Sequence, residues 1–259
     1  MKNSPARKPR SLVKRGDLFA IGKHRLLCGS ASSKEDVARL VGVEKISAVV
    51  SDPPYGVSFV ASKRGFSTLK MPKDIENDDI SSESEYAAFS RHWLDAFKPH
   101  LASKNSLYIF NSDRMIFALH DAMRQTGFTF SQLLVWAKQQ AVIGRKDYLP
   151  MHELIAFGWF GRHQFVRSKD KSVLVYPKPN KSPYHPTSKP VGLLRKLILN
   201  STHIGEIVYD PFVGGGSTGL AAEQTGRRCF MLEIDPEHCA TTIARLERLT
   251  GASAKLITK

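Results

Sequence analysis

The chain has 259 residues, of which 42% are hydrophobic and 24% charged, which is enough for a folded α/β domain with a sizeable core and excludes a disordered protein. No apolar run approaches the roughly 18 residues of a membrane span, which excludes a membrane-embedded protein. Lys and Arg outnumber Asp and Glu 38 to 24, and the net charge of +14 favours a polyanionic partner such as nucleic acid, although a merely soluble basic protein stays open.

The first predicted segment, residues 1–15, is basic and has no apolar signal core, so we expect a solvated or nucleic-acid-contacting arm. The cysteines form no CxxC pair, and His238 beside Cys239 lacks the further ligands of a zinc site. We therefore expect reduced thiols, no metal centre and a cytoplasmic location.

Residues 17–30 then predict two short strands around Gly22, and residues 33–42 predict a helix with Ser33 as its N-cap. A buried strand over 45–50 leads into Asp52-Pro53-Pro54-Tyr55, and the mixed stretch 60–80 predicts a long functional loop. Two helical patterns, over 82–101 and 113–127, alternate with apolar strands over 106–110, 130–138 and 151–160.

The amino-acid composition of the chain changes after residue 160. Residues 161–184 are rich in Lys, Arg and Pro and hold a single acid, Asp170, which predicts a basic insert outside the core. We expect this insert to contact phosphates, with a merely solvated face as the alternative. The candidate phosphate contacts, here and in the preceding loops, are Lys63, Arg64, Arg145, Lys146, Arg162, Arg167, Lys169, Lys171, Lys178 and Lys181.

The remaining residues return to a regular alternation. Helices over 191–202, 216–226 and from Pro236 onward alternate with strands over 206–210 and 227–235. Strands that alternate with helices in this way predict a doubly wound, mostly parallel sheet.

A glycine-rich loop joins the strand 206–210 to the next helix. Its Gly214-x-Gly216 spacing lets the backbone approach a ligand, and the helix N-terminus favours an anionic group, either a pyrophosphate or a methionine carboxylate. Asp210, directly before the loop, would repel a pyrophosphate and attract the α-ammonium of S-adenosylmethionine. An NAD-binding oxidoreductase is thus the weaker alternative. The candidate cofactor contacts are Asp210, Phe212, Gly214, Gly216, Ser217, Thr218 and Glu233, the last on the ribose hydroxyls.

The tetrapeptide Asp52-Pro53-Pro54-Tyr55 suits methyl transfer to an exocyclic amine. Such an amine is a poor nucleophile because its lone pair is delocalised, so the reaction needs acceptors for both amine hydrogens. Asp52 supplies one acceptor and the Pro53 carbonyl the other, while Pro53 and Pro54 stiffen the turn and remove competing N–H donors. Tyr55 supplies a ring on which an extruded base stacks.

These residues resemble the motifs of a known family. DPPY (52–55) resembles the catalytic motif of the DNA amino-methyltransferases, and DPFVGGG (210–216) resembles their S-adenosylmethionine loop. The order, catalytic motif first, is similar to the β group, which implies a circularly permuted Rossmann-like methyltransferase fold. HPTSKP (185–190) resembles the segment before the cofactor loop, which implies that Thr187 and Lys189 face the methionine carboxylate. Ser30 stands where the family commonly has an acid beside the cofactor's adenine.

The resemblance covers roughly Gly16 to Gly251 and implies an S-adenosylmethionine-dependent enzyme that methylates adenine N6 at a specific site in duplex DNA. Cytosine N4 is the near alternative, and a catalytically silent DNA-binding relative is a further one that the intact DPPY opposes. Dimerisation is an expectation from the resemblance alone. The implied organisation is an arm (1–15), a catalytic half (16–160), a target-recognition insert (161–184) and a cofactor-binding half (185–259).

Overall fold

The computed structural model of the chain describes residues 13–54, 82–141, 147–167, 169–178 and 189–258. The predicted loop 60–80 lies outside the described residues, as do Tyr55, Thr187, Lys63, Arg64, Arg145, Lys146 and Lys181. Within the described part, no helix is both long and apolar enough to cross a membrane.

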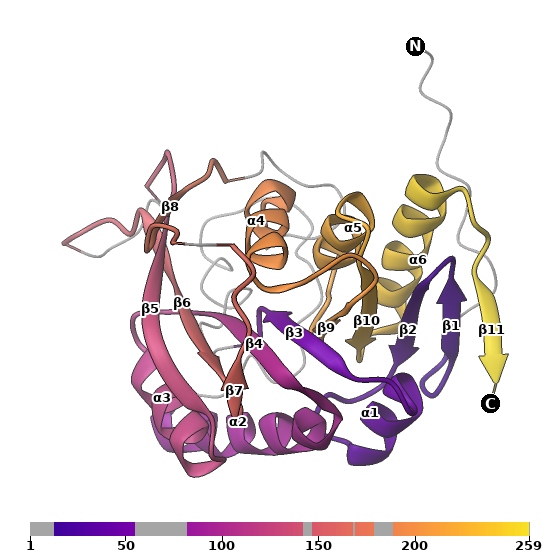
Figure 1. Cartoon of the computed structure of the whole chain (residues 1–259), viewed down its shortest axis with the longest axis horizontal. Helices are drawn as coiled ribbons and strands as arrows, with labels where there is room; N and C mark the ends of the chain where they lie inside the picture. The colour runs from indigo at the N-terminus through magenta and orange to yellow at the C-terminus, as the bar shows by residue number, and fades with distance from the viewer. Residues whose placement is uncertain (1–12, 55–81, 142–146, 168, 179–188, 259) are drawn as a thin grey trace, which may run out of the picture.

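A single twisted sheet runs through the molecule in the order β11-β1-β2-β10-β9-β3-β4-β6-β5-β8, with the short β7 beside β4 (Figure 1). Its central strands, from β2 to β4 in this order, are parallel, and the pairs β1–β2, β1–β11, β4–β6 and β5–β6 are antiparallel. The strands span Leu18–Ile21 (β1), His24–Cys28 (β2), Ile46–Ser51 (β3), Leu101–Asn111 (β4), Thr129–Ala137 (β5), His152–Trp159 (β6), Arg162–His163 (β7), Val173–Val175 (β8), Ile207–Asp210 (β9), Arg228–Glu233 (β10) and Lys255–Thr258 (β11).

Helices cover both faces of this sheet, as expected for a doubly wound fold (Figure 1). One face carries α1 (Lys34–Val41), α2 (Glu83–Phe97) and α3 (Ile116–Gln125), and the other carries α4 (Val191–Ser201), α5 (Ser217–Gln224) and α6 (Pro236–Thr250). A short 3-10 turn, Lys98–His100, joins α2 to β4. The expected alternation of strands and helices is confirmed.

Local sequence explains where several helices begin. The Ser33 side chain accepts from the Asp36 N–H and caps α1, as predicted. Ser82 and Glu85 form a reciprocal capping box at the start of α2, so that helix begins at Glu83. Asp235 caps α6 ahead of Pro236, whose missing N–H costs nothing at that position.

Two apolar cores lie on the two faces of the sheet. Because side chains alternate along a strand, Val49 of β3 packs with the core under α1 to α3, and Val50 packs with the core under α4 to α6. Trp93 of α2 is fully buried in the first core, and Leu193 of α4 in the second. β3 is buried along its whole length, so its C-terminal tip is held rigidly between two packed layers.

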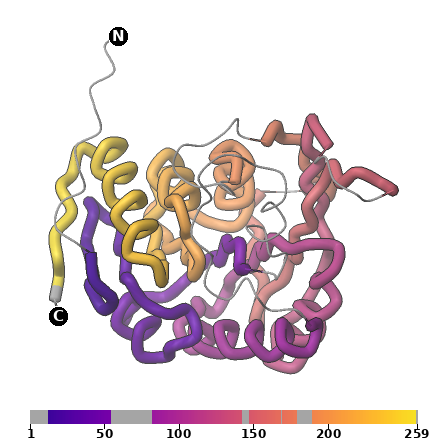
Figure 2. The backbone as a smooth tube through the Cα atoms, turned by 180° about the vertical axis from the view of Figure 1, so that it is seen from behind, coloured from indigo at the N-terminus to yellow at the C-terminus, as the bar shows by residue number. Residues whose placement is uncertain are grey.

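Two features differ from the expectations. β11 was not predicted, and it pairs with β1, which brings the two ends of the described chain together at one edge (Figure 2). The segment 161–184 was expected to add nothing to the core, which is wrong for its described part. Its strand β8 extends the sheet beside β5, with Leu174 buried, and its Gln164 side chain donates to the Ser201 carbonyl at 2.9 Å.

Candidate active site

The DPPY motif and the glycine loop meet at a topological switch point of the sheet, between β3 and β9. β3 and β9 are adjacent and parallel, yet the chain leaves β3 toward α2 on one face and leaves β9 toward α5 on the other. Crevices at the carboxyl ends of such strand pairs are the ligand sites of open α/β sheets. Asp52 directly follows β3 and Asp210 ends β9, so the structure places both predicted carboxylates at this edge.

A pocket opens at the same edge. We call it the strand-end pocket, and five of the side chains that line it are Ser30, Pro54, Phe89, Phe212 and Glu233. Ser30 follows β2, Pro54 belongs to the tetrapeptide after β3, and Glu233 is the last residue of β10. The pocket therefore brings together Pro54 of the tetrapeptide and three of the residues predicted to bind a cofactor, Ser30, Phe212 and Glu233.

The glycine loop has a conformation that only glycine adopts without strain. Gly214 and Gly216 have φ angles of 50° and 85°, and Gly216 is the N-cap of α5. A Cβ on Gly216 would lie 2.9 Å from the Thr242 Oγ1 atom. The Thr242 hydroxyl donates to the Gly214 carbonyl at 2.8 Å, and the Arg245 guanidinium donates to the Gly215 carbonyl. The loop is thus fixed from α6. Ser217 and Thr218, the first residues of α5, are buried directly behind it.

Glu233 connects the loop to β10. Its Oε2 atom accepts from the Gly214 N–H at 2.8 Å, and its Oε1 atom accepts from the Asp235 N–H at 3.0 Å. Glu233 also raises the pKa of the neighbouring His238, whose Nδ1 atom lies 3.8 Å from Oε1. A carboxylate has about four lone-pair sites, so Glu233 retains acceptor capacity toward the pocket that it lines.

Asp210 is a buried acid with little compensation. Its carboxylate accepts from the Phe212 N–H at 3.1 Å, and only 3% of the residue is exposed. Burial raises the pKa of Asp210 to about 7, the nearby charge of Asp52 adds to this, and the Thr218 side chain and the Phe212 N–H oppose it. A cationic ligand group beside Asp210 would favour the ionised form.

The two carboxylate oxygens of Asp52 have different surroundings. Its Oδ2 atom forms an ion pair with Lys189, whereas Oδ1 is buried and has no hydrogen-bond partner among the described residues. Burial raises the pKa of Asp52, which Lys189 opposes and Glu153 reinforces. An inaccessible acceptor without a donor is costly, so Oδ1 is a candidate position for a substrate N–H.

The comparisons with known proteins show the family of the chain. The family profile described as DNA methylase (N6_N4_Mtase) matches residues 46–244, which include Asp52 and the glycine loop. The chain belongs to the DNA methylase family. Methyltransferases of this family take their methyl group from S-adenosylmethionine. The type II methyltransferase M2.DpnII of Streptococcus pneumoniae is 28% identical to this methylase, over 79% of this chain and 83% of that one.

Solved structures show the same fold. The methylase superposes on the M1.HpyAVI–SAM complex with a TM-score of 0.64 and 22% identity, over 85% of this chain and 98% of that one. It superposes on the cytosine-N4-specific PvuII DNA methyltransferase with a TM-score of 0.68 and 16% identity, over 92% and 94% of the two chains. The predicted Rossmann-like methyltransferase fold is thereby confirmed.

Of three further residues predicted to bind the cofactor, two line the pocket and the third, Lys189, contacts Asp52. Phe212 lines the pocket and packs edge-on against Trp93, with ring centroids 5.5 Å apart. Ser30 also lines the pocket, and its N–H donates to Asp36 at 2.9 Å. Lys189 was expected to face a methionine carboxylate. In the structure its Nζ atom contacts Asp52 and, at 3.2 Å, Glu153, and its role toward a cofactor stays a prediction.

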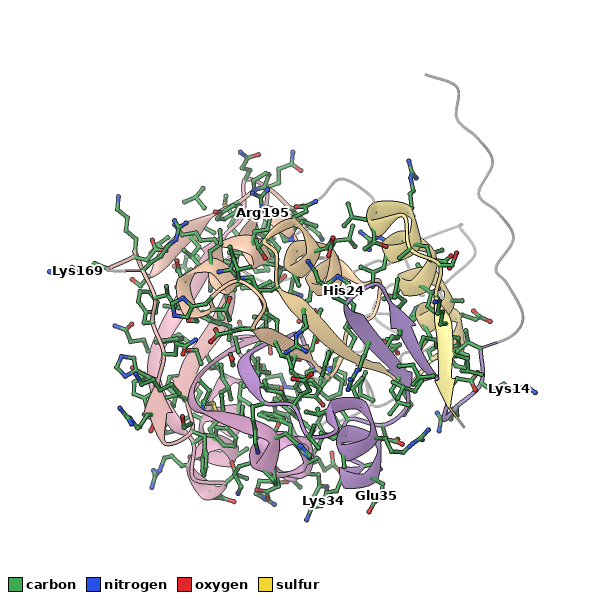
Figure 3. The ribbon with its side chains drawn as sticks, turned by 45° about the vertical axis from the view of Figure 1, so that its right-hand side comes forward. Lys14, His24, Lys34, Glu35, Lys169 and Arg195 are labelled. Carbon is green, nitrogen blue, oxygen red and sulfur yellow. The ribbon has the colours of Figure 1, made fainter. Side chains whose placement is uncertain are left out.

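The basic candidates that the structure describes lie on the surface. Arg162, Arg167, Lys169, Lys171 and Lys178 are all exposed, and Lys169 points away from the sheet (Figure 3). Asp170, the acid among them, is engaged by Lys196 and Asn200 of α4, at 3.0 and 2.8 Å. Its charge is therefore directed at α4 and away from the neighbouring lysines.

Sequence reasoning missed one buried ion pair of the methylase. Lys138 directly follows β5 and lies 2.7 Å from Glu153 of β6, with only 5% of its side chain exposed. The available signal was a lysine directly after an apolar strand and a glutamate near the start of the next strand. No group of three or more side chains able to hold a metal ion occurs in the part of the chain that the structure describes.

Proposed function

We propose that the methylase transfers the methyl group of S-adenosylmethionine to N6 of adenine in duplex DNA. The observation that carries this proposal is the Oδ1 atom of Asp52, which is buried and has no hydrogen-bond partner in the described part of the chain. Pro54, two residues further on, lines the strand-end pocket together with Phe212 of the glycine loop. An exocyclic amine is a donor that matches this acceptor, and a duplex is the polyanion that matches a net charge of +14.

The chain's own residues fit S-adenosylmethionine, which supplies an electrophilic methyl group on its sulfonium when bound. Asp210 offers a carboxylate for the ammonium group, and the first turn of α5, which has no side-chain cap, offers backbone N–H groups for the carboxylate. Glu233 lines the pocket with acceptors for the ribose hydroxyls, and Ser30 and Phe212 line it near β2 and α2. The similar fold of the M1.HpyAVI–SAM complex supports this arrangement.

The role of Asp52 follows from the chemistry of the amine. As the methyl group arrives, the amine nitrogen loses conjugation and its hydrogens become more acidic. Oδ1 of Asp52 accepts one hydrogen and the Pro53 carbonyl accepts the other, so their hydrogen bonds strengthen in the transition state. Tyr55, outside the described residues, stacks on the extruded base in this proposal.

Cytosine N4 is the second candidate target, because cytosine also presents an exocyclic amine. The cytosine-N4-specific PvuII enzyme has the same fold, which keeps this candidate in place. Asp52, where cytosine-N4 relatives lean to Ser, supports adenine. The exposed lysines and arginines of the segment 161–178 support a duplex as the partner.

The experiment is incubation of the chain with radiolabelled S-adenosylmethionine and unmethylated duplex DNA, followed by nucleoside analysis. We expect labelled N6-methyladenine. Label in N4-methylcytosine would replace adenine by the second candidate, and the absence of label in DNA from many sequences would reject both.

The first variant to test is Asp52→Ala. It should lower kcat in single-turnover methyl transfer by on the order of 10²–10³, with either KM nearly unchanged, because the lost bond acts mainly in the transition state. Asp52→Asn should retain more activity, since its amide oxygen still accepts. Asp95→Ala is the matched control, because Asp95 lies on α2 in a half-buried pair with Lys98 at 2.6 Å, and neither residue lines the strand-end pocket.

A further inference from the structure

Four charged side chains form a continuous chain that ends at Asp52. Lys138 contacts Glu153 at 2.7 Å, Glu153 contacts Lys189 at 3.2 Å, and Lys189 contacts the Oδ2 atom of Asp52. The two lysine side chains are only 5% and 7% exposed, and the two carboxylates 19% and 22%. We call these four residues the charge chain.

The charge chain joins parts of the fold that are distant in sequence. The register of the β5–β6 hairpin, with Trp136 opposite Glu153, places Lys138 beside Glu153. Lys189 lies two residues before α4, next to the N-cap Pro190. The Nζ atoms of both lysines also lie over aromatic rings, Lys138 at 5.1 Å from the Trp136 centroid and Lys189 at 5.2 Å from the Phe110 centroid.

Stability does not account for this arrangement. Removing charges from water costs several kcal/mol per ion, and buried ion pairs often contribute nothing net when compared with apolar residues. The charge chain instead determines the geometry of Asp52. Its Oδ2 atom is bound by Lys189, and its Oδ1 atom stays buried with no hydrogen-bond partner among the described residues.

We infer that Lys138, Glu153 and Lys189 are positioning residues that fix Oδ2 of Asp52 and leave Oδ1 to accept a hydrogen of the target amine. This inference rests on the proposed function. Lys189 holds the carboxylate, Glu153 holds Lys189, and Lys138 balances the charge of Glu153. The charge chain thus keeps Asp52 oriented before the base arrives, and within it Lys189 favours the ionised form of Asp52.

Because charges of both signs lie near Asp52, variants that remove one or the other should shift the pKa of Asp52 in opposite directions. The groups that face it are Lys189, Glu153, Lys138, Asp210 and Tyr86. Glu153→Gln removes a negative charge, so the pKa of Asp52 should fall. Lys189→Met removes a positive charge, so the pKa of Asp52 should rise. Opposite shifts would show that both charges lie close to the Asp52 carboxylate in the folded protein and act on it directly.

The direct test needs neither cofactor nor DNA. Carboxyl ¹³C NMR of aspartate-labelled protein follows the titration of Asp52, whose signal is identified by its loss in Asp52→Asn. We expect the midpoint to move down in Glu153→Gln and up in Lys189→Met, each by about one pH unit, as is usual for removing a charge within a few ångströms. Unchanged midpoints, or shifts in the same direction, would overturn the inference. Glu153→Gln alone decides the matter if Lys189→Met does not fold.

Kinetics give the second readout. The acid limb of the single-turnover rate should move to lower pH in Glu153→Gln and to higher pH in Lys189→Met, and Lys189→Arg should restore most of the rate. The matched controls are Lys23→Met and Glu44→Gln, which break surface pairs of 3.0 Å with Glu223 and 2.6 Å with Arg228. If Asp52→Ala keeps the wild-type rate, the proposed function fails. If Asp52→Ala is slow but both limbs stay in place, only the inference on the charge chain fails.

Discussion

Asp52 and Asp210 place two carboxylates at the tips of neighbouring strands, and both are raised in pKa by burial. Neither acid is needed to hold the sheet together, because the strands beneath them pair along their own backbones. Their burial therefore lowers stability in the absence of ligand. Sites prepared for a charged ligand commonly carry such a cost.

Asp210→Asn tests this cost. The pKa of Asp210 is about 7 in the folded protein, against a usual value of 3.8, so the folded state binds the proton more tightly than the unfolded state. The loss of stability caused by the buried, charged Asp210 carboxylate is absent below about pH 4, grows as the pH rises and is complete above about pH 7. We expect the variant to raise the free energy of unfolding by about 1–4 kcal/mol at pH 8 and to leave it unchanged at pH 4.

Denaturant titrations at the two pH values measure this effect, and calorimetry should show that the same variant binds S-adenosylmethionine more weakly. A variant less stable than wild type at pH 8 would mean that the Asp210 carboxylate is well compensated. Asp95→Asn, on the surface of α2, is the control for adding an amide.

At the scale of elements, the junction of β10, the glycine loop and α6 is held by Glu233. The carboxylate accepts from Gly214 and Asp235, so one side chain fixes both the loop before α5 and the turn before α6. This double contact means that a ligand role and a structural role of Glu233 have to be separated by experiment.

Glu233→Ala should weaken S-adenosylmethionine binding by about 1–3 kcal/mol, the range for a lost charged hydrogen bond. It should also lower Tm, because two N–H donors lose their partner, while binding of duplex DNA stays nearly unchanged. Glu237→Ala, an exposed change on the first turn of α6, is the control. Unaltered cofactor affinity in calorimetry would remove Glu233 from the cofactor site.

The elements that the sequence predicts well are those with a local signal. β3 is a continuous apolar run, α1 and α6 carry capping residues, and the glycines before α5 have a spacing that is visible without a structure. β11 and β8 have no such signal, because each is a short strand that exists only through its neighbour. The charge chain is hidden for the same reason: Lys189 and Asp52 are 137 positions apart.

At the scale of the whole molecule, the net charge of +14 includes exposed basic residues of the segment 161–178, whose contact with DNA can be tested. Changing Arg167, Lys169 and Lys171 together to Gln should reduce the slope of log K against log salt for duplex binding by up to about 3, if each residue contacts a phosphate. Fluorescence anisotropy over a range of salt concentrations measures the slope.

The control removes the same charge from another part of the surface. Lys45→Gln, Lys104→Gln and Arg124→Gln change exposed residues that lie before β3, within β4 and in the last turn of α3, and none of them lines the strand-end pocket. This control should leave the slope at its wild-type value. Equal slopes in both triple variants would make the segment 161–178 a solvated face.

The pairing of β1 with β11 also bears on ancestry. Leu18 lies opposite Thr258, so a short peptide could join these positions, and the described strands would then form a closed circuit. In such a closed chain, neither the half that carries Asp52 nor the half that carries the glycine loop precedes the other. Relatives that present the two halves in opposite order could therefore share one set of strand contacts, and a gene rearrangement could exchange the order without rebuilding the site.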